Sequence, residues 1–116
     1  MSPAFVESTS FTRHITRLGL EDDLRQLQWR LRESPEAGVL ERGTGGLRKI
    51  RIGSQGRGIG KRSGARIHYL YVKHAEIIYL LSVYRKSEQS TVSADDKRVL
   101  RKLVATLKRA QFHASR

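Results

Sequence analysis

The amino-acid sequence predicts an α+β fold, a single domain over residues 1–116 with helices packed against a mostly antiparallel four-stranded sheet, in the order β-α-α-β-β-β-α. Two runs rich in Ile, Val, Leu and Tyr, residues 65–72 and 76–84, flank the short polar turn 73–75, as in a β-hairpin. Apolar residues recur at helical spacing before and after this hairpin. The length of 116 residues suits one modest core.

The first 19 residues predict a strand followed by a helix. Residues 4–7 are apolar enough for a strand, and a hydroxyl group among residues 8–10 can cap the helix that follows. Gly19 ends this helix. Its buried face is predicted from the spacing of Phe11, Ile15 and Leu18.

The stretch LEDDLRQLQWRLRESP, residues 20–35, predicts a second helix. Three acids occupy its first turn, where the helix dipole favours negative charge, and Pro35 stops it. Trp29 lies off the apolar stripe, so its ring is left toward solvent, a neighbouring helix or a partner protein. A helix–helix contact within the domain is favoured over a partner site. The stripe consists of Leu20, Leu24, Leu27 and Leu31.

A strand and a glycine-rich connection follow. Residues 47–52 alternate, which places Arg48, Ile50 and Ile52 on one face of the strand and the other three residues, Lys49 and Arg51 among them, on the opposite face. Residues 53–64 carry five glycines and no hydrophobic period, so they predict a flexible connection to the next strand.

The last strand and the last helix complete the domain. Alternation along residues 76–84 predicts that Tyr84 shares a face with Ile78, Leu80 and Ser82, and that Tyr84 and Lys86 project together near the sheet margin. The sequence SADD at residues 93–96 is a capping box with an acid in the Glu/Gln position. It begins a helix whose predicted stripe is Leu100, Leu103, Val104 and Leu107.

The charge of the chain is strongly basic and unevenly distributed. The formal net charge is +12, which favours a polyanionic partner such as RNA or the ribosome. Residues 1–41 hold seven acids and five basic residues, whereas residues 42–116 hold four acids and eighteen basic residues. The partner surface is therefore expected in the second part.

Several classes of protein are disfavoured. No window approaches the roughly 18 apolar residues of a membrane span, and the N-terminus lacks the pattern of a signal peptide, so a cytoplasmic location is expected. The chain has no cysteine and no metal-ligand spacing among its histidines, so neither a metal nor another cofactor is expected. The segment GRGIGKRS fails as a nucleotide-binding P-loop, because Gln55 and Arg62 stand where a glycine and a hydroxyl residue are needed.

Basic residues and a tyrosine near the sheet margin suggest RNA cleavage by the substrate's own 2′-hydroxyl. That reaction needs a base, an acid and cations around the phosphorane, and no metal. His68 is a further candidate base, although a hydrogen-bonded position within the sheet is the favoured interpretation. Binding without chemistry is the alternative for the whole set. The candidates from this reasoning are Arg48, Lys49, Lys61, Arg66, Tyr84 and Lys86.

Three segments in this order, GTGGLRKIR, GKRSGARIHYLY and IYLLSVYRKSE, closely resemble the consecutive motifs of HigB-type toxins in the RelE/ParE toxin superfamily. The resemblance extends from FVES at residues 5–8 to the final helix. It implies a single RelE-like domain, the toxin of a type II toxin–antitoxin system. Such a toxin enters the ribosomal A site on the 30S subunit and cuts mRNA there. A cognate helix-turn-helix antitoxin neutralises it and reaches operator DNA, which the toxin contacts only through the antitoxin.

Carried over motif by motif, the resemblance implies the same residues as the chemistry. Lys61 and Arg66 are expected to stabilise the phosphorane, and Tyr84 or Lys86 to transfer protons, with base and acid left open. The residues expected to bind RNA are Arg48, Lys49, Arg51, Arg57 and Arg62.

One position departs from the family pattern. Ser63 stands where the family has glycine, which reduces backbone freedom at that point of the connection. Two other functions remain open. They are ParE-like poisoning of gyrase, which keeps the fold and cuts no RNA, and RNA or ribosome binding without catalysis.

Overall fold

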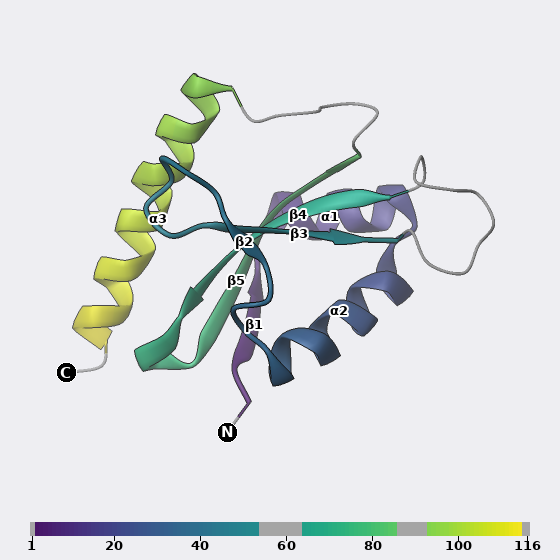
Figure 1. The fold of residues 1–116 in the computed structure, drawn as a ribbon, viewed down its shortest axis with the longest axis horizontal. Coiled ribbons are helices and arrows are strands. Elements are labelled where there is room, and N and C mark those ends of the chain that lie inside the picture. Colours follow the sequence, from purple (N-terminus) through teal and green to yellow (C-terminus); the bar gives the residue numbers. More distant parts are fainter. Residues whose placement is uncertain (1, 54–63, 86–92, 115–116) are drawn as a thin grey trace.

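The computed structural model of the protein describes residues 2–53, 64–85 and 93–114. In these ranges the chain forms three α-helices and a five-stranded sheet, and helices cover both faces of the sheet (Figure 1). The elements in chain order are β1 (Ala4–Glu7), α1 (Thr9–Leu18), α2 (Glu21–Glu33), β2 (Val39–Leu40), β3 (Arg48–Ile52), β4 (Ala65–Val72), the 3-10 turn η2 (Lys73–Ala75), β5 (Ile77–Arg85) and α3 (Ala94–Ala114).

The sheet confirms the predicted α+β class and adds one strand. Its order is β1-β5-β4-β3-β2, with β1 parallel to β5 and the other neighbours antiparallel. The prediction of four strands was wrong because β2 has only two residues, too few to show an alternating pattern. Val39 and Leu40 of β2 are both exposed and pair with Lys49 and Arg48 at the edge of the sheet.

The two faces of the sheet carry separate hydrophobic cores. Helices α1 and α2 cover one face, and α3 crosses the other (Figure 1). The first core contains Phe11, Ile15, Leu20, Leu24, Leu27, Leu31, Ile50, Ile52, Ala65, Ile67, Tyr69, Ile78, Leu80 and Val83. The second core contains Leu47, Leu70, Val72, Tyr79, Leu81 and Val104.

The predicted helix ends are confirmed. The Ser8 hydroxyl accepts a hydrogen bond from the backbone N–H of Phe11 at 3.1 Å and caps α1. Gly19 ends α1 in the left-handed conformation, with φ of 68°. The Ser93 hydroxyl accepts from the N–H of Asp96 at 3.1 Å, as expected for the cap of α3.

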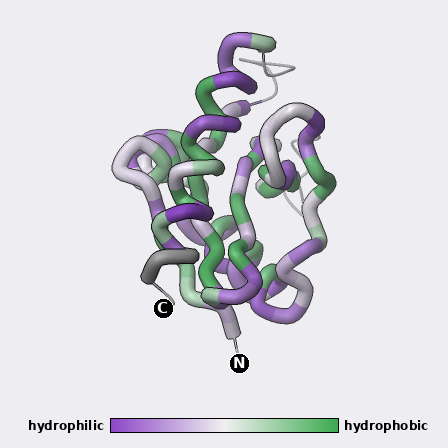
Figure 2. The backbone as a smooth tube through the Cα atoms, turned by 90° about the vertical axis from the view of Figure 1, so that its left-hand side faces the viewer, coloured by the Kyte–Doolittle hydropathy of each residue, from purple (hydrophilic) through white to green (hydrophobic). Residues whose placement is uncertain are grey.

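Helix α3 contacts the sheet through a narrow apolar stripe. Val104 is buried, and Leu100 and Leu107 pack against the second core, as predicted. Leu103 was also placed on this stripe, but 39% of its surface is exposed, because α3 covers only part of the sheet face. Figure 2, viewed from the side of α3, shows hydrophilic and hydrophobic residues alternating along this helix.

The motif GTGG, residues 43–46, holds the chain beneath α3. Thr44 is fully buried, and its hydroxyl donates to the carbonyl of Glu41 at 2.7 Å and accepts from the N–H of Leu47 at 3.1 Å. The ammonium group of Lys108 on α3 donates to the carbonyl of Gly45 at 2.7 Å. Gly45, with φ of 80°, lies under Val104, and an added Cβ would make ordinary contact with that side chain at 3.6 Å. This motif therefore has a structural role in seating α3.

Trp29 lies on the outer surface of α2, with 66% of its surface exposed. The favoured prediction, a contact with a neighbouring helix of the same domain, was wrong. The guanidinium carbon of Arg32 lies 4.9 Å from the Trp29 ring centre and 5.4 Å from that of Phe5, so the arginine stacks between the two rings. A helix can expose a large ring in this way when a neighbouring cation covers part of it.

We expect Gly38→Ala to destabilise the fold by about 2–3 kcal/mol. The hydroxyl of Tyr69 accepts from the N–H of Gly38 at 2.9 Å and donates to the carbonyl of Pro35 at 2.8 Å, which fixes the chain after α2. A Cβ at position 38 would lie 2.8 Å from the Tyr69 ring and 3.0 Å from the carbonyl oxygen of Lys49. Denaturant unfolding measures the loss.

Gly19→Ala is the matched control for this substitution. An added Cβ at Gly19 meets nothing within 4 Å, so only the left-handed backbone resists it. A loss of about 1 kcal/mol is expected there. Equal losses for the two variants would mean that the close approach of Gly38 to Tyr69 does not matter.

Candidate functional site

A β-bulge in β5 determines which side chains meet on the face of the sheet that α3 crosses. His68 pairs with Ser82, but the next residue, Tyr69, pairs with Leu80, so Leu81 is an extra residue in β5. The predicted alternation, with Tyr84 on the face of Ile78 and Leu80, was therefore wrong. The bulge turns Ser82 and Tyr84 onto the opposite face.

Three residues form a row across this face. Arg51 of β3 pairs with Arg66 of β4, and Arg66 pairs with Tyr84 of β5. Paired residues of antiparallel strands point to the same side, so two guanidinium groups and a phenol are neighbours in the Arg51–Arg66–Tyr84 row. Like charges directly opposite one another destabilise a sheet, and a bound phosphate would offset that repulsion.

A second row lies beside the first and is neutralised by one carboxylate. Lys49 pairs with His68, and His68 pairs with Ser82. Oε1 of Glu41 lies 3.5 Å from Nζ of Lys49 and 3.4 Å from Nε2 of His68, while Nδ1 of His68 lies 3.0 Å from the Ser82 hydroxyl. The favoured prediction for His68, a position hydrogen-bonded within the sheet, is confirmed.

The charges in this second row follow from burial. Burial lowers the pKa of His68 below 6.5, although the hydrogen bond and charge of Glu41 oppose this, so the imidazole is neutral at pH 7. Burial alone would raise the pKa of Glu41, but His68 and Lys49 outweigh it, and the pKa is lowered from 4.5. A neutral His68 therefore donates a hydrogen bond from Nε2–H to an ionised Glu41, and its Nδ1 accepts a hydrogen bond from the Ser82 hydroxyl.

Tyr84 keeps its proton at neutral pH. Burial raises the pKa of its phenol above 10, and the charge of Glu41 adds to this, while Arg66 acts in the opposite direction. Nearby cations favour deprotonation of a phenol. Among the described residues their effect is outweighed, because the half-buried phenol is poorly solvated and lies near a carboxylate.

A cavity of about 400 Å³ opens beside Tyr84, between α1, the end of β5 and α3. Its polar groups come from elements far apart in the sequence, and its size would admit a nucleobase. The lining residues are Ser10, His14, Arg17, His68, Ser82, Val83, Tyr84, Asp96, Val99 and Leu100.

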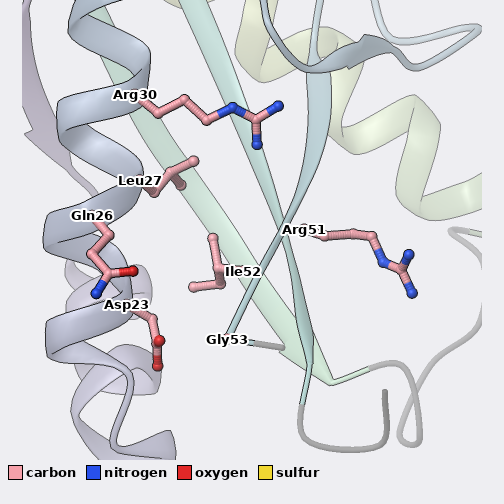
Figure 3. Close-up of a pocket in the computed structure, with 7 residues that line it drawn as sticks. All are labelled: Asp23, Gln26, Leu27, Arg30, Arg51, Ile52 and Gly53. Atoms are coloured by element: carbon pink, nitrogen blue, oxygen red, sulfur yellow. The ribbon is translucent and has the colours of Figure 1, made fainter. Parts of the chain in front are cut away.

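A second cavity, of about 460 Å³, lies between α2 and the end of β3 (Figure 3). Ile52 and Leu27 lie on the side of α2, whereas Arg51 points away from Arg30 toward the other side of the strand (Figure 3). This confirms the predicted alternation of β3, which sends Ile52 into the first core and Arg51 to the opposite face.

Arg48 lies on the opposite face of the sheet from Lys49 and Arg51, the two other predicted RNA-binding residues that the structure describes. It pairs with Tyr69 on the face covered by α1 and α2. Its guanidinium donates to the carbonyls of Glu36 and Gly38 at 3.1 and 2.7 Å and pairs with the Glu36 carboxylate at 3.1 Å. Arg48 and Lys49 were predicted to point to opposite faces of this strand, and the pairing confirms it, so Arg48 lies apart from Lys49.

The remaining predicted site residues lie outside the described part of the chain. They are Arg57, Lys61, Arg62 and Lys86, together with Ser63 and most of the glycine-rich connection. Sequence reasoning missed Glu41, Ser82 and the cavity residues of α1 and α3. Glu41 follows directly on the unrecognised strand β2, which hid its position beside β3 and β4.

We expect the protein to lose stability as the pH falls below about 6.5. The pKa of His68 is lowered in the folded protein, so the unfolded chain binds a proton that the folded chain does not. Acid therefore favours unfolding, beginning near the ordinary pKa of 6.5. Thermal unfolding between about pH 7.5 and 5 tests this while staying above the ordinary pKa of Glu41, 4.5.

His68→Asn should flatten this dependence, because the titrating group is gone. His74→Asn is the matched control, since His74 lies exposed in η2. An unchanged slope in the His68 variant would show that another group causes the acid sensitivity.

Comparison with known proteins supports the fold. No protein-family profile matches the chain. Among solved structures, the chain is similar to the toxin RelE of E. coli, solved in the free state as a double arginine-to-alanine mutant, with a TM-score of 0.59 and 19% sequence identity. The match covers 78% of this chain and 90% of the RelE chain. The chain therefore has a RelE-like α+β fold.

Two further findings concern membrane-spanning helices and metal binding. None of the helices in the described ranges is long and apolar enough to cross a membrane. Among the described residues, no group of three or more His, Cys, Asp or Glu side chains could hold a metal ion.

Proposed function

We propose that this protein is the toxin of a type II toxin–antitoxin pair, of HigB type within the RelE superfamily, and that it cuts mRNA in the ribosomal A site. The Arg51–Arg66–Tyr84 row carries the proposal, because it places two guanidinium groups, which suit phosphate oxygens, beside a protonated phenol on one face of the sheet. The RelE-like fold and the three sequence motifs support the same assignment.

The proposed reaction is attack of a ribose 2′-oxygen on the adjacent phosphorus. A base takes the 2′-hydroxyl proton as the new P–O bond forms. The bond from phosphorus to the 5′-oxygen then breaks, and that oxygen takes a proton from an acid. The products are a 2′,3′-cyclic phosphate and a 5′-hydroxyl, so atoms and charge balance without a metal.

Each described residue fits one step. Arg66 is half-buried beside Tyr84, so its guanidinium can hold two phosphate oxygens as negative charge develops on them. Tyr84 holds its proton, which suits the acid that protonates the 5′-oxygen. Lys49 and Arg51 lie on the same face and position the RNA. Lys61 is proposed to stabilise the phosphorane, and Lys86 to act in proton transfer.

Arg48 is left out of this set. Its guanidinium is occupied by the chain after α2 on the opposite face, so its contribution is to the fold. The proposed partners are the 30S A site, translated mRNA and a helix-turn-helix antitoxin, through which alone the toxin meets operator DNA. The proposed location is the cytoplasm, where these partners are found.

A cell-free translation reaction with the purified protein tests the function. Mapping of mRNA ends should show new 5′ ends within translated codons, and these should disappear when ribosomes are omitted. Intact mRNA with translation blocked would indicate ribosome binding without catalysis. Intact mRNA together with loss of DNA supercoiling by gyrase would indicate a gyrase poison.

A further inference from the structure

We propose that Glu41 is a positioning residue of this site, which holds Lys49 and His68 in place, His68 being the ring that lies beside Tyr84. Its part in cleavage rests on the proposed function. Its effect on Tyr84 does not, and can be measured without RNA.

The backbone of Glu41 is fixed by the turn that GTGG forms. Its N–H donates to the carbonyl of Leu47 at 2.8 Å, and its carbonyl accepts from the hydroxyl of the buried Thr44 at 2.7 Å. Lys108 of α3 holds the same turn through the carbonyl of Gly45. The carboxylate therefore starts from a rigid point, and its side chain is only 16% exposed.

From that point the carboxylate reaches across two strands. One oxygen, Oε1, meets both Nζ of Lys49 on β3 and Nε2 of His68 on β4, at 3.5 and 3.4 Å. His68 continues the connection to the Ser82 hydroxyl on β5, and its ring centre lies 5.7 Å from that of Tyr84. A single carboxylate thus orients a cation on β3 and a ring on β4, and that ring lies beside the phenol.

The negative charge of Glu41 affects the pKa of Tyr84. Residues 42–116 carry a large excess of basic side chains, which would lower the pKa of a phenol among them. Glu41 is the ionised acid whose charge acts on Tyr84 in the opposite direction and raises its pKa, after burial itself. Among the described residues, the other charged or titratable groups that line the cavity beside Tyr84 or stand in its two strand rows are Arg17 and His14 of α1, Lys49 and Arg51 of β3, Arg66 and His68 of β4, and Asp96 of α3.

Glu41→Gln is the test, because it removes the charge and keeps the shape. Phenolate absorbance is followed against pH in each protein, and the curve of the same protein carrying Tyr84→Phe is subtracted to isolate Tyr84. We expect the Tyr84 midpoint to move to lower pH in Glu41→Gln. Glu36→Gln is the matched control, since Glu36 pairs with Arg48 on the opposite face. The Tyr84 midpoint in this variant should equal that of the wild type.

Cleavage gives the second measurement. Glu41→Gln should cleave mRNA about 10-fold more slowly at neutral pH, because a neutral amide holds the Lys49 ammonium and the His68 ring more weakly than the carboxylate does. As the pH is raised, its activity should begin to fall at a lower pH than that of the wild type, by the same shift as the Tyr84 midpoint. Glu41→Asp keeps the charge with a shorter reach, so its Tyr84 midpoint should lie between those of wild type and Glu41→Gln.

The outcomes separate the two proposals. A Tyr84 midpoint that is the same in the wild type and in Glu41→Gln overturns the role of Glu41. If the Tyr84 midpoint shifts in Glu41→Gln but the wild-type protein cuts no mRNA, the role of Glu41 toward Tyr84 is supported and the proposed cleavage is overturned.

Discussion

Arg66→Ala is expected to lower the rate of ribosome-dependent mRNA cleavage by about 10²–10³-fold, with little change in stability. Arg66 stands between Arg51 and Tyr84 at the centre of the row, so among the described cations it is the one best placed to meet the proposed scissile phosphate. Its removal takes away charge stabilisation that grows as the phosphorane forms, and also relieves the repulsion from Arg51 in the free protein. Single-turnover cleavage on stalled ribosomes measures the effect.

Two controls sharpen this result. Arg66→Lys keeps the charge but cannot bind two oxygens in one plane, so it should recover only part of the rate. Arg25→Ala removes an arginine from the outer surface of α2, where its side chain is 69% exposed, and should cleave at the wild-type rate. Equal rates for Arg66→Ala and Arg25→Ala would exclude Arg66 from catalysis and leave general attraction to RNA as its role.

Much of the fold was predictable because local rules act along short stretches. The caps at Ser8, Gly19 and Ser93 and the acids that begin α2 mark helix ends from the sequence alone. The β4–β5 hairpin follows from its apolar runs and short turn. Strand β2 carried no such signal, since its two residues are held only by pairing with β3.

The candidate site was predictable in part, but the β-bulge in β5 could not be predicted from the sequence. Residue types alone gave Arg66 and Tyr84, and the register of the hairpin made them neighbours. The face on which Tyr84 lies depends on whether Leu81 is an extra residue in β5, because one inserted residue reverses every later side chain. Pairing between strands decides that, and no pattern within residues 76–84 reveals it.

Glu41 illustrates a different limit. It is separated from His68 by 27 residues in sequence. It reaches His68 because β3 runs back along β2 after the GTGG turn, and that turn fixes the backbone of Glu41 beside β3. Nothing in the GTGG motif itself predicts this role. Its contacts with α3 instead show how a glycine turn can serve a site indirectly, by holding a carboxylate at a defined distance from two strands.

Tyr84→Phe is expected to lower the cleavage rate by about 10²–10⁴-fold, the range for loss of a general acid or base. The ring would still pack beside His68, so the fold and RNA binding should persist. Because the phenol is protonated at neutral pH, the missing function is proton donation to the 5′-oxygen. Tyr71→Phe, a half-buried tyrosine packed against the first core, is the matched control and should keep wild-type cleavage.

A change in the leaving group distinguishes an acid from a base at Tyr84. In an mRNA with sulfur in place of the scissile 5′-oxygen, the leaving group is a thiolate that departs without protonation. If Tyr84 is the acid, this substrate should restore the rate of Tyr84→Phe almost to that of the wild type, whereas Arg66→Ala should remain slow, since its defect lies in stabilising charge on the phosphorane. If Tyr84 instead accepted the 2′-hydroxyl proton, sulfur at the leaving position would leave the defect of Tyr84→Phe largely uncorrected. The raised pKa of the phenol, caused first by burial and then by Glu41, is the physical reason to expect the first result.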